Sequence, residues 1–204
     1  MKHSLKRLFV AAGMVAIFSV PTFAAKAKIG ELAPNFTLTD ITGETHQLSD
    51  FAGKTVVLEW VNPDCPFVVK HYSSGNMPAL QSSSTSEGVV WLAINSGSPG
   101  TQGDYDPAEV MAWMEKTGAA PSAYLRDQDG TVGRLYGAKT TPHMYVINPD
   151  GKLVYDGAID SIRSANQRDI PKAENYVATA LAAVKSGNMP ERTTTQPYGC
   201  SVKY

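Results

Sequence analysis

The segment LEWVNPDCPFVVKHY, residues 58–72, decides the fold. It joins the end of a β-branched apolar run to a helix-like stretch, and Cys65 stands directly before the proline that opens this stretch. Pro66 suits a first helical turn, which needs no N–H donor from it. We therefore expect Cys65 at a helix N-terminus, where unpaired N–H groups and the helix dipole favour the reactive thiolate. The alternative is a buried structural cysteine, a common fate of free cysteines.

Strand-like and helix-like patterns alternate through the rest of the chain. Residues 36–48 are typical of a hairpin, and the runs 55–61 and 89–94 are apolar on both faces, which indicates central strands covered by helices. A second hairpin follows at 144–155, and a last helix is predicted over 171–185. This order predicts an α/β fold.

The ends of the chain differ from its middle. Residues 1–24 combine a basic start, an apolar run of eleven residues and a small-x-small cleavage site, and so resemble a cleaved signal peptide. We expect one domain over 25–187, a polar tail over 188–204, no stable membrane anchor, and a periplasmic or secreted protein. Three of the 18 basic residues lie in the signal and all 19 acidic residues follow it, so nucleic acid is not an expected partner.

Three stretches resemble the thioredoxin fold, and specifically the redoxin or AhpC/TSA (alkyl hydroperoxide reductase/thiol-specific antioxidant) group. They are IGELAPNFTLTDITGETHQLSDFAGKTVVLEW at 29–60, DCPFVV at 64–69 and YGAKTTPHMYVINPDGKLVYDGAID at 136–160. The resemblance implies a thioredoxin-like α/β fold, a central mixed sheet flanked by helices, with an N-terminal hairpin extension. It also implies that Pro142, after Thr141, is cis and lies beside the active cysteine.

The active-site motif departs from both of the related enzyme patterns. Thioredoxins carry C-x-x-C, but Val68 stands at the second cysteine position. Peroxiredoxins carry P-x-x-x-T-x-x-C, but Leu58 and Asn62 stand at the proline and threonine positions. A thiol peroxidase is therefore an alternative to disulfide exchange, and the sequence places neither Arg126 nor Arg163 at the thiolate.

A site with one motif cysteine needs a second thiol for resolution, and Cys200 is the candidate, with a free or intermolecular cysteine as its alternative. Glu59 lies in an otherwise apolar strand, where it is a candidate proton shuttle or a strand-end residue reaching solvent. His143 suggests a further alternative, a copper(I) carrier that uses Cys65, His143 and Cys200. His71 is expected at the end of the helix, where positive charge is favourable.

These residues lead to one functional hypothesis with several alternatives. We expect an exported thiol–disulfide oxidoreductase in which Cys65 attacks, Cys200 resolves, Thr141 and Pro142 shape the substrate groove, and Glu59 shuttles the proton. The cysteines carry the electrons, so no organic cofactor is expected, whereas an external thiol donor is required to reset the pair. A peroxiredoxin-like peroxidase, a copper(I)-binding protein and a redox-silent binding protein are the alternatives.

Overall fold

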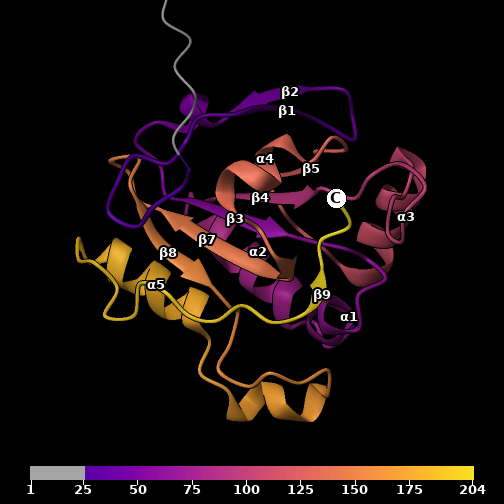
Figure 1. Ribbon diagram of the computed structural model, residues 1–204. Helices are drawn as coiled ribbons and strands as arrows, with labels where there is room; N and C mark the ends of the chain where they lie inside the picture. The colour runs from indigo at the N-terminus through magenta and orange to yellow at the C-terminus, as the bar shows by residue number, and fades with distance from the viewer. Residues whose placement is uncertain (1–25) are drawn as a thin grey trace, which may run out of the picture.

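The computed structural model describes residues 26–204, so the predicted signal peptide over 1–24 lies outside the described residues. A seven-stranded mixed sheet forms the centre, in the order β2-β1-β5-β4-β3-β7-β8 (Figure 1). Its strands are β1 (Thr37–Asp40), β2 (Thr45–Gln47), β3 (Val56–Trp60), β4 (Val90–Asn95), β5 (Ala123–Arg126), β7 (His143–Ile147) and β8 (Leu153–Gly157). Two short strands, β6 (Thr140–Thr141) and β9 (Cys200–Ser201), pair with each other outside this sheet.

Helices cover the sheet on both faces, as Figure 1 shows. The helices are α1 (Pro66–Ser73), α2 (Asn76–Ser86), α3 (Pro107–Thr117), α4 (Thr131–Tyr136) and α5 (Tyr176–Lys185), with short 3-10 helices η1 (Leu48–Phe51) and η2 (Gln167–Lys172). Buried side chains of α1, α2, α3 and α5 pack on one face, and those of α4 and η1 pack on the other. Within residues 26–204, every helix is too short or too polar to cross a membrane.

Strands β3 and β4 run in parallel, and β7 runs antiparallel to β3. All residues of β3, β4 and β7 are buried, which confirms the prediction of central strands covered on both sides. The N-terminal hairpin is also confirmed, since β1 pairs with β2 and joins the sheet through β5.

The last helix begins later than predicted, at Tyr176 instead of residue 171. Pro171 lies inside η2, and the side chain of Asn175 accepts a hydrogen bond from the N–H of Ala178 at the start of α5. This cap fixes the beginning of the helix because it satisfies one of the N–H groups that have no intrahelical partner.

Candidate active site

Cys65 is the N-cap residue of α1, as the sequence predicts, and Pro66 is the first helical residue. The turn before it is held by Asn62, whose carbonyl oxygen accepts from the N–H of Cys65 (3.0 Å) and whose side chain accepts from the N–H of Asp64 (2.9 Å). The parallel pairing of β3 with β4 brings this turn to the carboxyl edge of the central strands. The thiol therefore lies at the positive end of a helix.

Thr141 and Pro142 lie beside Cys65, although they are more than seventy positions away in the chain. The peptide bond between them is cis, which confirms that prediction. The Cys65 thiol donates a hydrogen bond to the carbonyl oxygen of Thr141, with 2.9 Å between sulfur and oxygen. The start of β7 thus forms one wall of the thiol site.

The C-terminal tail returns to the same place. Strand β9 pairs antiparallel with β6, with Cys200 opposite Thr141. The backbone N–H of Cys200 points at the sulfur of Cys65, with 3.4 Å between nitrogen and sulfur. Gly199 permits this approach, because its φ is 144° and a Cβ there would lie 2.0 Å from the carbonyl oxygen of Thr141. The two cysteines are therefore neighbours, and both are free thiols in this structure.

The two thiols differ in exposure and in acidity. Cys65 is fully buried, whereas Cys200 is partly exposed. Burial alone would raise the pKa of the Cys65 thiol, but the donor groups of Cys200 and the Thr141 side chain, which favour the thiolate, outweigh it and lower that pKa below its ordinary value. Burial and the neighbouring Cys65 sulfur raise the pKa of Cys200 to about 11. Cys65 is thus the better thiolate of the pair.

The hydroxyl group of Thr141 is a further feature of the site. Thr141 is buried, and its Oγ1 is the one buried side-chain oxygen or nitrogen in the described part of the chain without a hydrogen-bond partner. An unpaired buried hydroxyl costs about 1–3 kcal/mol. It is available to a thiolate on Cys65, and it is among the groups that lower the pKa of that thiol.

This arrangement of an N-cap cysteine beside a cis-proline agrees with the comparison to known families. The model of the AhpC/TSA family matches residues 29–156, which is more than half of the chain. The chain belongs to the AhpC/TSA family.

Individual relatives of this AhpC/TSA protein support the same fold. Thiol-disulfide oxidoreductase ResA of Bacillus subtilis (strain 168) is 29% identical over an alignment of 166 residues that covers 73% of this chain and 83% of ResA. An uncharacterized conserved protein of Geobacillus kaustophilus is similar in structure, with a TM-score of 0.76, 28% identity, and coverage of 89% of this chain and 94% of its own. A hypothetical protein of Sinorhizobium meliloti 1021 has a TM-score of 0.73 at 24% identity, covering 89% and 97%, and shows the fold alone.

Glu59 of this AhpC/TSA protein is fully buried on the sheet face that carries α1 and α2. It accepts hydrogen bonds from the hydroxyl of Tyr72 (2.8 Å), the amide of Gln81 (3.0 Å) and the indole of Trp91 (2.8 Å). Burial raises its pKa to about 7, although all three hydrogen bonds act in the opposite direction. Neither oxygen of Glu59 is hydrogen-bonded to Cys65 in the described structure, so the proton-shuttle role stays a prediction.

Of the three ligands expected for copper(I), the two cysteines lie together, but His143 is hydrogen-bonded elsewhere. His143 binds Asp156 through Nε2 (2.7 Å), and its Nδ1 accepts from the N–H of Lys139 (3.2 Å). Both ring nitrogens are therefore engaged away from the two sulfurs. Among residues 26–204, the group of three ligand-type side chains close enough to hold an ion is instead Asp40, Glu44 and His46 in the β1–β2 hairpin.

The structure also shows the surroundings of two further basic residues, His71 and Arg126. His71 lies in the last turn of α1, as predicted, but it is not a positive group there: it is fully buried, and burial lowers its pKa to about 4, so that the ring is neutral near pH 7. Arg126 pairs with Asp104 (3.0 Å between Nη2 and Oδ1), so its guanidinium is engaged away from the thiol.

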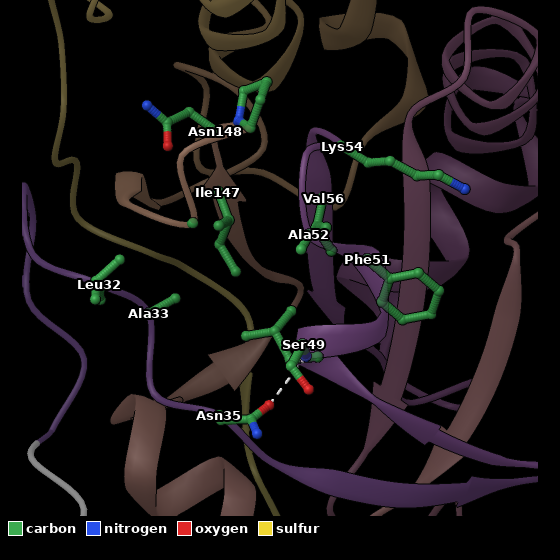
Figure 2. Close-up of a pocket in the computed structure, with 13 residues that line it drawn as sticks. Leu32, Ala33, Asn35, Ser49, Phe51, Ala52, Lys54, Val56, Ile147 and Asn148 are labelled. Atoms are coloured by element: carbon green, nitrogen blue, oxygen red, sulfur yellow. Dashed lines mark hydrogen bonds between the residues drawn. The ribbon is translucent and has the colours of Figure 1, made fainter.

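A cavity of about 220 Å³ lies at the other end of β3. Leu32, Phe51, Val56 and Ile147 line it, and Figure 2 shows these largely apolar side chains around it. Val56 begins the strand whose far end leads to Cys65, so the cavity is separated from the thiol by the length of β3. It takes no part in the thiol site.

Sequence reasoning missed the side chains that support the site from behind. Lys70, Asp160 and Tyr198 form a buried polar cluster with His71 next to the tail. The available signal was weak: Lys70 follows an apolar run in α1, and a lysine there is ordinarily assigned to the surface. Gln81, which binds Glu59, gave no signal at all.

Proposed function

We propose that this thioredoxin-type thiol–disulfide oxidoreductase works through Cys65 as the attacking thiolate and Cys200 as the resolving thiol. The single observation that carries the proposal is the contact of Cys200 with the sulfur of Cys65 through the β6–β9 pair. The lowered pKa of Cys65 supports its role as the nucleophile, and ResA, a relative by sequence, is named a thiol-disulfide oxidoreductase.

The proposed reaction has two exchange steps. In the first, the Cys65 thiolate attacks one sulfur of a substrate disulfide, the substrate S–S bond breaks, and one substrate thiolate leaves and takes up a proton. In the second, Cys200 loses its proton and attacks the Cys65 sulfur, which forms the Cys65–Cys200 disulfide and releases the second substrate thiol. The substrate is reduced by two electrons, and an external thiol donor returns the protein to the reduced state.

Thr141, Pro142 and Glu59 have supporting roles in this proposal. The Thr141 carbonyl holds the neutral thiol, and its unpaired hydroxyl is the donor available to the thiolate. Pro142 follows this carbonyl through a cis bond and leads into β7. Glu59, with a pKa of about 7, is a proton-holding group beneath α1 and acts on the thiol indirectly in this proposal.

Substrate and compartment follow from the same features. Cys65 is fully buried beneath the tail, so a small disulfide reaches it more easily than a protein disulfide does while β9 is docked. Residues 1–24 resemble a signal peptide, so we place the reaction in the periplasm or outside the cell, where disulfides persist.

The test is mass spectrometry of the reduced mature protein after treatment with a small excess of oxidised glutathione or with one equivalent of hydrogen peroxide. A Cys65–Cys200 disulfide formed with glutathione supports the proposal. A disulfide or sulfenic acid formed far faster with peroxide than with glutathione supports the peroxidase alternative. A persistent glutathione adduct on Cys65, with Cys200 unchanged, would contradict the resolving role.

A further inference from the structure

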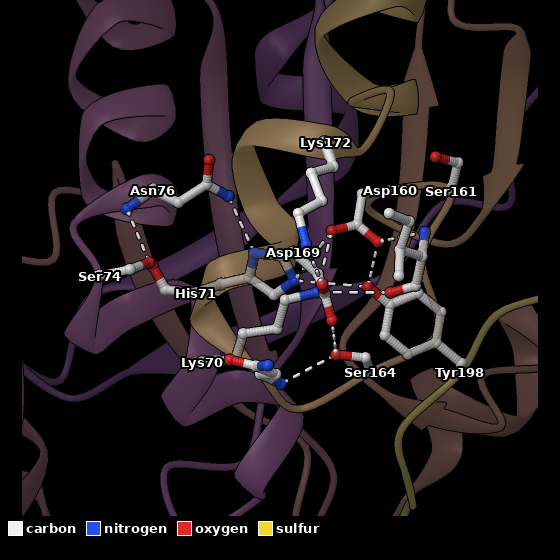
Figure 3. Close-up of polar contacts among 12 residues, drawn as sticks. Lys70, His71, Ser74, Asn76, Asp160, Ser161, Ser164, Asp169, Lys172 and Tyr198 are labelled. Atoms are coloured by element: carbon white, nitrogen blue, oxygen red, sulfur yellow. Dashed lines mark hydrogen bonds and ion pairs between the residues drawn. The ribbon is translucent and has the colours of Figure 1, made fainter.

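A buried polar cluster anchors the tail next to the thiol pair. We call it the latch cluster, and it consists of Lys70 and His71 of α1, Asp160 after β8, and Tyr198 of the tail. Figure 3 shows the four side chains converging from these separate elements. The side chain of Lys70 is fully buried and that of Asp160 is 4% exposed, which is unusual for two charged residues.

The polar groups of the latch cluster are paired with one another by hydrogen bonds. Lys70 donates to Asp160 Oδ2 (3.1 Å) and to the carbonyl oxygen of Ile162 (3.4 Å). The Tyr198 hydroxyl donates to the other carboxylate oxygen of Asp160. His71, neutral because burial lowers its pKa, lies 3.5 Å from the Tyr198 hydroxyl through Nε2. Asp160 therefore links helix α1 to the tail by two separate oxygens.

Stability alone does not explain such a cluster. Replacing a buried ion pair by apolar side chains is often neutral or stabilising, because desolvation offsets the attraction of the charges. A buried polar contact has one geometry that satisfies it, whereas apolar contacts tolerate sliding. The latch cluster thus defines where Tyr198 sits, and the edge-to-face contact of its ring with Phe67 (5.7 Å between ring centroids) holds the same position.

The position of Tyr198 in turn limits the position of Cys200. The two residues are two positions apart, so an extended chain separates their Cα atoms by about 7 Å. Gly199 between them is confined by the carbonyl oxygen of Thr141. Beyond Cys200 the tail is held by the N–H of Val202, which donates to the carbonyl oxygen of Lys139 (3.1 Å). The latch cluster is the buried, charge-assisted member of these restraints.

We propose that Tyr198, held by Asp160 and Lys70, is a positioning residue that sets how fast Cys200 closes the disulfide with Cys65. The inference rests on the proposed function. Tyr198 is hydrogen-bonded to neither sulfur in the described structure, so it acts on the thiol pair only through the position of the tail. A loosened tail spends less time with Cys200 in contact, which lowers the effective concentration of this thiol in the second step.

The experiment separates the two steps in time. Reduced protein is mixed with excess oxidised glutathione, quenched with acid, alkylated and analysed by mass spectrometry for the Cys65–glutathione adduct and the Cys65–Cys200 disulfide. Tyr198→Phe keeps the ring and removes the hydroxyl. Losing a hydrogen bond to a carboxylate should slow closure, measured as the first-order conversion of the Cys65–glutathione adduct to the Cys65–Cys200 disulfide, about tenfold or more.

Two more variants complete the design. Tyr136→Phe is the matched control, since its buried hydroxyl binds the carbonyl oxygen of Pro34 (2.6 Å) away from the tail, and both rates should stay at the wild-type values. Asp160→Asn keeps one acceptor oxygen for Tyr198 but loses the charge, and should slow closure as well. Near-ultraviolet circular dichroism checks the folding of each variant.

The outcomes separate this inference from the proposed function. Closure at the wild-type rate in folded Tyr198→Phe and Asp160→Asn overturns the positioning role and leaves the pairing of Cys65 with Cys200 intact. A wild-type protein that forms no Cys65–Cys200 disulfide overturns the pairing itself, and the inference with it. Equal slowing in Tyr136→Phe would show a general loss of stability and would also overturn the positioning role.

Discussion

Glu59→Gln should change the pH dependence of stability. The carboxyl group of Glu59 has three donors around it and no cation, and its burial raises its pKa from 4.5 to about 7. Glutamine has nearly the same shape. Its oxygen can accept from Gln81 and Trp91 at the Oε2 position, and its amide can donate to the Tyr72 oxygen, so the packing should survive.

The magnitude follows from the shift in pKa. Because the folded protein holds the Glu59 proton more tightly than the unfolded chain does, this contribution to stability is fully present below pH 4.5 and is lost as the pH rises to about 7. One pKa unit corresponds to roughly 1.4 kcal/mol, so the loss amounts to about 3 kcal/mol. Glutamine carries no such proton. Glu59→Gln should therefore become more stable relative to the wild type as the pH rises, by about 3 kcal/mol in all.

The assay is urea unfolding of the reduced wild type and Glu59→Gln at a series of pH values between about 4 and 8. The difference in unfolding free energy between the two proteins removes the contributions of all other titrating groups. Glu87→Gln, at a surface carboxylate paired with Lys185, is the control for removing one negative charge. A difference between wild type and Glu59→Gln that stays constant over this pH range would refute the raised pKa and the account of Glu59 as a proton-holding group.

Three other predictions concern the thiol site. Gly199→Ala should disrupt the β6–β9 pair and slow disulfide closure with glutathione about tenfold or more, because its Cβ would overlap the Thr141 carbonyl. Gly187→Ala is the control, since Gly187 also has a positive φ but has open space around the Cβ position. Equal closure rates in the two variants would contradict the steric argument. Thr141→Val should raise the pKa of Cys65, measured by the ultraviolet absorbance of its thiolate, because the hydroxyl that favours the thiolate is removed. It should also stabilise the reduced protein by about 1 kcal/mol, since the unpaired buried hydroxyl disappears. An unchanged pKa would show that this hydroxyl does not stabilise the thiolate. Cys200→Ser should accumulate the glutathione adduct on Cys65, and rapid release of glutathione from that adduct without added thiol would count against resolution by Cys200.

Local pattern was sufficient to predict the α/β class, and the resemblance of three stretches to the redoxin group added the thioredoxin-like fold. The apolar runs of β3 and β4, the proline after Cys65 and the hairpins at both ends each indicate one element, and their order indicates the α/β class. The exception is the start of α5, since Pro171, where the helix was predicted to begin, lies inside η2 and the cap at Asn175 decides the boundary. Capping depends on one side chain, so it is easily missed in a periodic pattern.

The site was predictable in part: residues in local motifs could be identified from the sequence, whereas contacts between residues far apart in the chain could not. Cys65 and Pro142 lie in motifs that carry their own structural meaning, whereas the contact of Cys200 with Cys65 depends on how the whole tail packs. The partners of Glu59 come from three different elements, and those of Asp160 from two, so neither network could be inferred from spacing. The charge of His71 was misjudged for the same reason, because its burial depends on Asp160 and the tail.

The separation of Cys65 and Cys200 by 135 positions links oxidation to folding. A disulfide between them would close a covalent loop that includes most of the domain. In the simple entropic treatment, the lost conformational entropy would raise the free energy of the unfolded chain by about 5 kcal/mol. Folding and oxidation then form a thermodynamic cycle, so the disulfide must be favoured in the native state by the same amount. In each turnover such an enzyme would alternate between a disulfide-bonded form that resists unfolding and a reduced form that is less stable. Its lifetime would depend on which of the two forms its surroundings maintain.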